Sequence, residues 1–185
     1  AFTDGMKVSH GIDGRVGERN AMPLFNLAWK RSFFWDGRAP SLREQVLMPI
    51  QDHREMDQTL EAATAKLKDR PDYRQSFQAA FKSGEVTAET MALALEQFLL
   101  TLSARSSRFD QAMGGKASLS DEEKRGFELF MTEYEPRTGQ YGADCFHCHG
   151  GALFSDHQFH NNGLSGNDPG RAGVTGLDSD QRKFS

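Results

Sequence analysis

The segment Cys145-Phe146-His147-Cys148-His149 decides how this chain is interpreted, because it contains both cysteines of the 185-residue sequence. Two cysteines three positions apart, followed directly by a histidine, form the pattern of covalent haem attachment. On one helical turn the two thiols face the same side and can bond the two vinyl groups of one porphyrin, while the neighbouring imidazole reaches the iron. The spacing therefore predicts a haem c bound by Cys145 and Cys148, with His149 as the proximal ligand.

Two other interpretations of the cysteine pair remain open beside haem. Zinc usually takes four ligands, and the sequence has no second cysteine pair, although His157 and His160 could complete a Cys2His2 set. Their spacing differs from that of a zinc finger. A redox-active dithiol is typically flanked by alternating strands and helices, whereas Gly, Ser and Asn dominate here. Haem is favoured over both, and His147, at a variable position of the motif, is not predicted as a ligand.

Composition restricts the class of protein. A length of 185 residues fits one domain or two small ones that share a haem interface. No apolar run approaches the roughly 18 residues of a membrane span, and a net charge of -4 with interspersed signs argues against nucleic acid and lipid surfaces. Haem of this type is attached outside the cytoplasm, so we expect a periplasmic protein. No signal peptide is visible, and the chain starts as mature or trimmed material would.

Apolar periodicity and capping motifs predict an all-α fold with long ordered loops. No strand pattern of useful length is present, and residues 1–30 and 150–185 are rich in glycine or in turn-forming residues. The helix over residues 87–102 is predicted to be central and buried. The first predicted helix begins with a capping box at Ser41–Glu44 and ends or bends at Pro49, and the last begins with a second capping box at Ser120–Glu123. The apolar residues of the second to fifth predicted helices are, in order, Leu60, Ala63 and Leu67, before Pro71; Tyr73, Phe77 and Phe81; Met91, Leu95, Phe98 and Leu102; and Phe127, Phe130 and Met131.

The functions of His10 and of the aromatic cluster at residues 33–35 cannot be assigned from their local sequence alone. His10 lies in a glycine-rich loop, where a histidine is more often a surface residue than a ligand. Phe33, Phe34 and Trp35 precede the turn-forming pair Asp36-Gly37, and core packing is the expected role of such a cluster. Whether Trp35 also lies between two redox centres stays open at this point.

Several motifs, in this order along most of the chain, resemble the bacterial di-haem cytochrome c peroxidases. The resemblance implies a cytochrome c-like fold with two small haem domains, in which peroxide is reduced at the first haem and electrons enter through the second. We therefore expect residues 1–110 to be part of the N-terminal peroxidatic domain and residues 111–185 to be part of the C-terminal electron-transfer domain. The matching segments are GERN at 17–20 with Pro23 and Asn26, FFWDGRAPSLREQ at 33–45, Pro49 with Glu55-Met56, CFHCHGG at 145–151 and FSDHQFHNNG at 154–163.

The chain departs from the family pattern in one large respect. The family carries two CxxCH motifs, and only the second occurs here. The first is expected shortly before residue 1, and the sixth ligand of the second haem is expected beyond Ser185. We therefore expect an internal piece of a longer di-haem protein, incomplete at both ends; the alternative is a chain that lacks the peroxidatic haem.

The resemblance implies roles for two residues of the peroxide pocket and for one aromatic residue between the haems. Glu55 matches the acid/base residue, which moves a proton between the two oxygens of peroxide as their bond breaks. Gln45 matches a residue that hydrogen-bonds in the same pocket. Trp35 matches the aromatic residue between the two haems, where a π system provides a path for electrons.

The resemblance also implies ligands. His10 matches the residue that binds the peroxidatic iron on its distal side in the resting oxidised state and moves away on activation. Asn20 matches a calcium ligand at the domain interface, where a hard cation accepts an amide oxygen. His160 and Asn161 match a recurring segment after the haem and are expected to make packing or propionate contacts.

The implied activity is the reduction of hydrogen peroxide to water with electrons from a small cytochrome c or copper protein, in a family whose members are often dimers. Two alternatives stay open. One is a related di-haem enzyme that oxidises a protein substrate, as the tryptophylquinone-forming enzymes do. The other is a mono-haem electron carrier, which needs a sixth iron ligand inside this chain.

Overall fold

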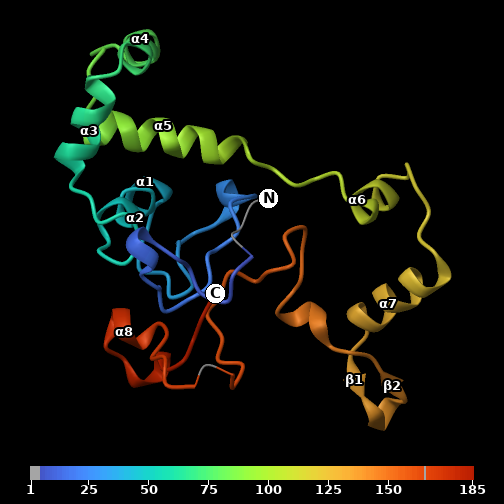
Figure 1. Ribbon diagram of the computed structural model, residues 1–185. Coiled ribbons are helices and arrows are strands. Elements are labelled where there is room, and N and C mark those ends of the chain that lie inside the picture. The colour runs from blue at the N-terminus through green and yellow to red at the C-terminus, as the bar shows by residue number, and fades with distance from the viewer. Residues whose placement is uncertain (1–4, 165) are drawn as a thin grey trace. The chain divides into compact units, whose positions relative to one another are not determined.

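The computed structural model describes residues 5–164 and 166–185 of the chain (Figure 1). The described residues are mostly helical with little sheet, as predicted. They form two compact units: the chain up to Ser103 together with Phe159–Ser185, and Ala104–Gln158. The predicted division after residue 110 concerns haem domains and stays a prediction. None of the helices within the described ranges is long and apolar enough to span a bilayer.

The first unit contains five of the longer elements labelled in Figure 1, α1 to α5, and short helical turns near both of its ends. Helix α5 is its longest element and is contacted by α1, α3 and η2. Its elements are η1 (Ile12–Gly14), η2 (Leu27–Trp29), α1 (Leu42–Gln45), α2 (Met48–Gln51), α3 (Leu60–Lys68), α4 (Pro71–Ala80), α5 (Ala88–Thr101), α8 (Ala172–Thr175) and η5 (Asp178–Asp180).

Helix starts follow the predicted capping residues, but the first helix ends earlier than expected. The Ser41 hydroxyl oxygen accepts the Glu44 amide at 3.2 Å and so caps α1. Helix α1 ends at Gln45, and Pro49 lies in the first turn of α2 instead of ending α1. Proline is tolerated there because first-turn amides have no intrahelical partner. The expectation that the helix ends or bends at Pro49 was therefore wrong in position: α1 ends at Gln45, and Pro49 lies in the first turn of the next helix.

Two apolar clusters form the core of the first unit. One lies under α1, α5 and η2, and the other lies between α3, α4 and α5. Fully burying one aliphatic or aromatic side chain contributes about 1.5–3 kcal/mol, so these clusters are the main source of stability in this unit. The first cluster comprises Leu27, Phe33, Ala39, Leu42, Val46, Ala92 and Leu99; the second comprises Ile50, Phe77, Val86 and Met91, with Leu60, Ala63 and Leu67 packed against it.

Helix α5 is amphipathic and not fully buried, which corrects the prediction. Met91, Ala92 and Leu99 are buried, whereas Phe98 is 60% exposed and Leu95 lies at the edge with 36% exposed. Ala92 and Leu99 pack in one apolar cluster, and Met91 packs in the other. The repeat of four, three and four residues identified the helix and the buried Met91, but it included the exposed Phe98 and omitted Ala92 and Leu99.

The second unit contains α6 (Arg108–Met113), α7 (Asp121–Met131), the strands β1 (Tyr134–Glu135) and β2 (Gln140–Tyr141), and the turns η3 (Pro136–Thr138) and η4 (Cys145–His147). The Ser120 capping box begins α7 as predicted. Residues 132–144 contain a small antiparallel hairpin, although the sequence shows no strand pattern of useful length. Its strands pair Tyr134 with Tyr141, whose rings lie 6.3 Å apart. Two-residue strands are too short to give an alternating pattern in the sequence.

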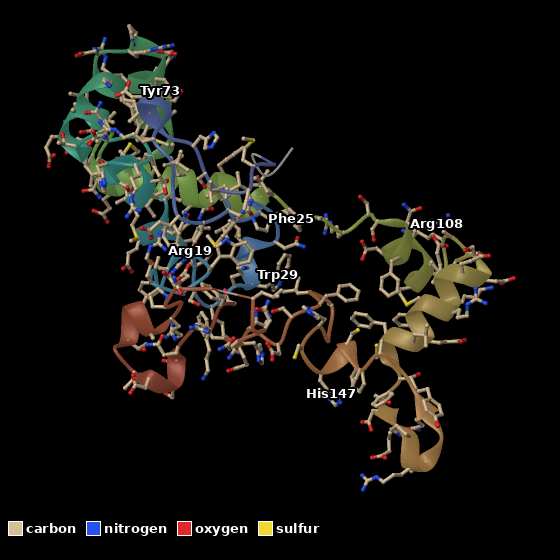
Figure 2. The ribbon with its side chains drawn as sticks, turned by 60° about the horizontal axis from the view of Figure 1, so that its bottom comes forward. Arg19, Phe25, Trp29, Tyr73, Arg108 and His147 are labelled. Atoms are coloured by element: carbon tan, nitrogen blue, oxygen red, sulfur yellow. The ribbon has the colours of Figure 1, made fainter. Side chains whose placement is uncertain are left out.

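A network of charges joins the start of the first unit to its C-terminal segment. The Arg19 guanidinium donates to both carboxylate oxygens of Asp168, at 2.7 and 2.8 Å, and also to Asp36. Asp36 is buried, with 5% of its surface exposed. Figure 2 shows the Arg19 side chain among the loops of this unit. The pairing lowers the pKa of Asp168, chiefly through the hydrogen bond from Arg19.

Replacing Arg19 by Gln is expected to destabilise the first unit by about 2–3 kcal/mol, because a buried carboxylate loses a charged donor. The measurement is the denaturant midpoint of the haem-loaded protein followed by circular dichroism. Arg70→Gln is the matched control, since Arg70 also binds an aspartate, Asp72, but both side chains are at least 60% exposed. Equal midpoints for the two variants contradict the prediction.

Candidate functional site

The haem-attachment motif lies on the turn that its spacing predicts. Cys145–His147 form the 3-10 turn η4, Cys148 continues in the right-handed helical region, and the His149 amide donates to the Cys145 carbonyl at 2.9 Å. Neither cysteine forms a disulfide; Cys148 is exposed and Cys145 is half-buried. Both thiols are therefore available for covalent attachment.

The His149 imidazole is oriented by the loop that follows it. Its Nδ1 lies 3.2 Å from the carbonyl oxygen of Phe154, the arrangement by which proteins fix the ring of a metal-binding histidine and leave Nε2 for the metal. Phe154 has φ of 52°, which is strained for a bulky residue and aims this carbonyl back at the motif. Gly150 permits the tight path, because a Cβ there would lie 2.6 Å from the Phe146 carbonyl oxygen.

The packing of the second unit fits a large apolar group. Throughout Ala104–Gln158 the structure buries no residue fully, although four phenylalanines cluster beside the motif. Their rings meet edge to face at 5.2 to 5.9 Å. An unusual share of apolar surface around the motif remains uncovered, as expected where a porphyrin supplies the core. The clustered residues are Phe109, Phe127, Phe130 and Phe154, and the exposed apolar residues near them in sequence include Met113, Leu129 and Met131.

His147 is placed as a surface residue. Its side chain is 55% exposed, and its Nε2 lies 3.2 Å from Asp144 and 3.8 Å from Glu133 (Figure 2). Over residues 5–164 and 166–185, no three His, Cys, Asp or Glu side chains are arranged to hold a metal ion. The zinc interpretation, with His157 and His160 as further ligands, therefore has no ligand set in this part of the chain.

A second candidate site lies in the first unit, where a cavity of about 440 Å³ is lined by the two residues expected in the peroxide pocket and by the aromatic residue expected between the haems. Trp35, Gln45 and Glu55 all line this cavity, here called the Trp35 cavity, and so does Asn20. Much of the remaining wall is apolar, from Met22, Pro23, Leu24, Leu27, Phe33 and Phe34.

Glu55 lines three of the cavities in the described part of this unit. It also lines a space of about 330 Å³ with Phe34, Arg38 and Asp52, here called the Arg38 cavity. A third space, of about 470 Å³, is shared by Glu55 and His10. Burial is the main cause that raises the pKa of Glu55, the negative charge of Asp52 raises it further, and Arg38 opposes the shift. A raised pKa makes a carboxyl group better suited to both accept and release a proton.

Trp35 is fixed from both sides by backbone contacts. Its indole Nε1 donates to the Asn20 carbonyl at 2.8 Å, and its own carbonyl accepts the Ser185 amide at 2.8 Å. Asn20 therefore acts here through its peptide oxygen, while its side-chain amide donates to the Met6 carbonyl. Its role as a calcium ligand stays a prediction.

The loop that carries His10 packs against the Glu55 turn. The Ile12 amide donates to the Glu55 carbonyl at 2.7 Å, and Arg15 binds Asp57 at 2.6 Å. Gly11 is required at this contact, because a Cβ would lie 1.9 Å from the Arg54 carbonyl oxygen. His10 itself is exposed. The structure thus places His10 on one side of Glu55 and the Trp35 cavity on another.

Further residues of this site were not singled out from the sequence. Arg38 and Asp52 line the Trp35 cavity beside Glu55. Asp36 accepts the Arg38 amide through its side chain at 3.1 Å, which is the turn that Asp-Gly predicts. That turn was the only local signal: Arg38 binds Asp36 two residues before it, but Arg19 and Asp168, which complete this charge network, come from distant parts of the chain.

The helical fold and a CxxCH turn with an oriented histidine define the class as a c-type haem protein. Within that class, the chain belongs to the di-haem cytochrome c peroxidase family: the sequence profile described as Di-haem cytochrome c peroxidase matches residues 1–118. The family implies haem c as the cofactor.

Similarity to individual proteins extends over nearly the whole chain. The methylamine utilization protein MauG of Methylorubrum extorquens is 38% identical over 173 residues, covering 92% of this chain and 46% of that protein. The cytochrome c551 peroxidase of Nitrosomonas europaea is 33% identical over 189 residues, covering 98% and 54%. The crystal structure of a MauG-like protein associated with microbial copper homeostasis superimposes with a TM-score of 0.84 at 28% identity, covering all of this chain and 58% of that one. The chain thus spans about half the length of the curated relatives it matches.

Proposed function

We propose that this chain is part of a di-haem c-type peroxidase that reduces hydrogen peroxide to water. The observation that carries the proposal is the meeting of Glu55, Gln45 and Trp35 at one cavity, where burial raises the pKa of the Glu55 carboxyl. Cys145, Cys148 and His149 are the proposed attachment site of one covalent haem. The second haem is expected from a part of the protein outside this chain, with the apolar wall of the Trp35 cavity against it.

The proposed architecture is two cytochrome c-like haem domains, with residues 1–110 in the peroxidatic domain and residues 111–185 in the electron-transfer domain. Support comes from the family assignment and from the order of the motifs along the chain. His10 is the proposed distal ligand of the resting enzyme. Its loop packs on the Glu55 turn, which supports a link between loop position and pocket shape.

The proposed chemistry consumes two protons and two electrons for each hydrogen peroxide and gives two waters. A haem iron, when bound, supplies the centre at which peroxide is held and reduced. Glu55 takes the proton from one peroxide oxygen and delivers it to the other, so that water and not hydroxide leaves. The Gln45 amide orients peroxide through a hydrogen bond. Trp35, fixed by Asn20, is the proposed aromatic group on the electron path.

The proposed partners and location follow the family. Electrons come from a small periplasmic cytochrome c or copper protein, the enzyme forms a homodimer, and calcium binds near Asn20. The similarity to cytochrome c551 peroxidases supports a cytochrome donor. No contact with nucleic acid or a lipid surface is proposed.

A second candidate function is the oxidation of a protein substrate by the same pair of haems. The 38% identity to a methylamine utilization protein MauG favours it. The discriminating residue is the sixth ligand of the second haem, expected as Met in a peroxidase and Tyr in the protein-oxidising relative, beyond Ser185.

The test of the proposal uses the full-length protein. We expect two haems per chain by mass spectrometry of the denatured protein, and oxidation of a reduced small cytochrome at two equivalents per hydrogen peroxide. One haem per chain and no peroxide-dependent oxidation would overturn the proposal in favour of a mono-haem carrier. Two haems without peroxide turnover would favour the protein-oxidising alternative.

A further inference from the structure

Arg38 is fixed more firmly than an arginine at a cavity wall usually is. Its Nη1 lies 3.1 and 3.2 Å from the two carboxylate oxygens of the buried Asp36. Its Cζ lies 3.6 Å from the centre of the Phe34 ring, a close cation–π contact. Because Asp36 is itself held by Arg19, the guanidinium keeps one position instead of swinging into solvent.

The fixed guanidinium lines the same spaces as Glu55. Both residues line the Trp35 cavity and the Arg38 cavity. The other two arginines at the Trp35 cavity are engaged elsewhere: Arg19 binds Asp36 and Asp168, and Arg54 binds Glu18 at 2.6 Å. Of these three arginines only Arg38 also lines the Arg38 cavity, so it is the one that shares both cavities with the Glu55 carboxylate.

We propose that Arg38 is a further positioning residue of this site: it supplies the fixed positive charge against which the Glu55 carboxylate is held in its proton-accepting form. This inference rests on the proposed peroxidase function, because it deepens the role given to Glu55. Arg38 acts through Glu55 and takes no proton itself, since a guanidinium stays charged throughout the pH range of proteins.

The balance of charges around Glu55 agrees with this role. Burial and the neighbouring Asp52 both favour the protonated acid and raise the pKa of Glu55, whereas Arg38 lowers it. Removing Arg38 leaves the two raising influences unopposed, so the carboxyl stays protonated to a higher pH. The charged or titratable groups that line cavities with Glu55, apart from Arg38, are His10, Glu18, Arg19, Asp36, Asp52 and Arg54.

The experiment compares Arg38→Gln, Arg38→Lys and the wild type as haem-loaded full-length proteins. Infrared titration follows the carboxyl band of Glu55, which is identified by its loss in Glu55→Gln. The pH dependence of kcat/KM for hydrogen peroxide is measured on the same samples, and its low-pH side, the acid limb, is compared. Arg70→Gln is the control, because Arg70 also binds an aspartate and lies 5.4 Å from an aromatic ring, but its side chain is exposed and lies directly before α4.

We expect Arg38→Gln to move both the infrared titration and the acid limb to higher pH, Arg38→Lys to restore them in large part, and Arg70→Gln to leave them unchanged. A Glu55 band that titrates at the wild-type pH in Arg38→Gln overturns the inference. If the wild type shows no peroxide turnover, the proposed function fails, and the infrared titration alone still decides the role of Arg38. If Arg38→Gln loses turnover but shifts neither the infrared titration nor the pH profile of kcat/KM, Arg38 has a purely structural role, and the inference is also overturned.

Discussion

Peroxide turnover is expected to fall by about 10² to 10⁴-fold in Glu55→Gln, the range that a positioned acid/base group contributes. Glutamine has nearly the same shape and keeps a hydrogen-bonding group in the Trp35 cavity, but it cannot carry the proton from one peroxide oxygen to the other. Because the substitution does not touch the haem-attachment residues, both haem spectra should match those of the wild type. The measurement is steady-state oxidation of a reduced small cytochrome by hydrogen peroxide in the full-length protein.

Glu61→Gln is the matched control for this prediction. Glu61 lies in the first turn of α3 in the same unit, is exposed, and lines none of the described cavities. Peroxide turnover of the Glu61→Gln variant should equal that of the wild type. Wild-type turnover in Glu55→Gln would remove Glu55 from the mechanism, whatever the control shows.

Local features of the fold could be predicted because their causes are local. A capping serine needs only the amide three residues later, as Ser41 and Ser120 show, and an apolar stripe such as Leu60, Ala63 and Leu67 needs only its own helix. The buried face of α5 depends on which elements pack against it, which the periodicity of Leu95 and Phe98 does not contain. The hairpin at residues 132–144 was missed because its strands are too short.

The candidate sites likewise include features with local causes, which the sequence reveals, and features with long-range causes, which it does not. The CxxCH turn and its histidine are readable from five consecutive residues, since the chemistry needs them on one turn. The expected roles of Trp35, Gln45 and Glu55 came from a family resemblance, which put only Gln45 and Glu55 in one pocket; that Trp35 lines the same cavity comes from the structure. The network that holds Arg38 combines Asp36 with Arg19 and reaches Asp168, residues up to 149 positions apart. Charge pairs across such separations leave no local pattern, so the sequence could not reveal them.

The covalent haem is expected to be lost from the second unit when both cysteines are replaced by serine. The denatured Cys145→Ser/Cys148→Ser chain should lose one haem of added mass relative to the wild type. His149→Ala should lose the proximal ligand, so its haem spectrum should change even where a thioether bond persists. His147→Ala is the matched control two residues away: its ring is exposed and contacts Asp144 and Glu133, so haem content and spectrum should stay as in the wild type.

Loss of this haem should also loosen the packing of the second unit itself. Since no residue of Ala104–Gln158 is fully buried by the chain alone, we expect a bound porphyrin to cover the phenylalanines beside the motif. The double serine variant should therefore bind a hydrophobic dye and be cleaved by protease within residues 104–158, while the first unit, with its own apolar clusters, resists. A protease-resistant second unit in that variant would show that its core does not depend on the haem, and would contradict the fit between the motif and the uncovered aromatic side chains.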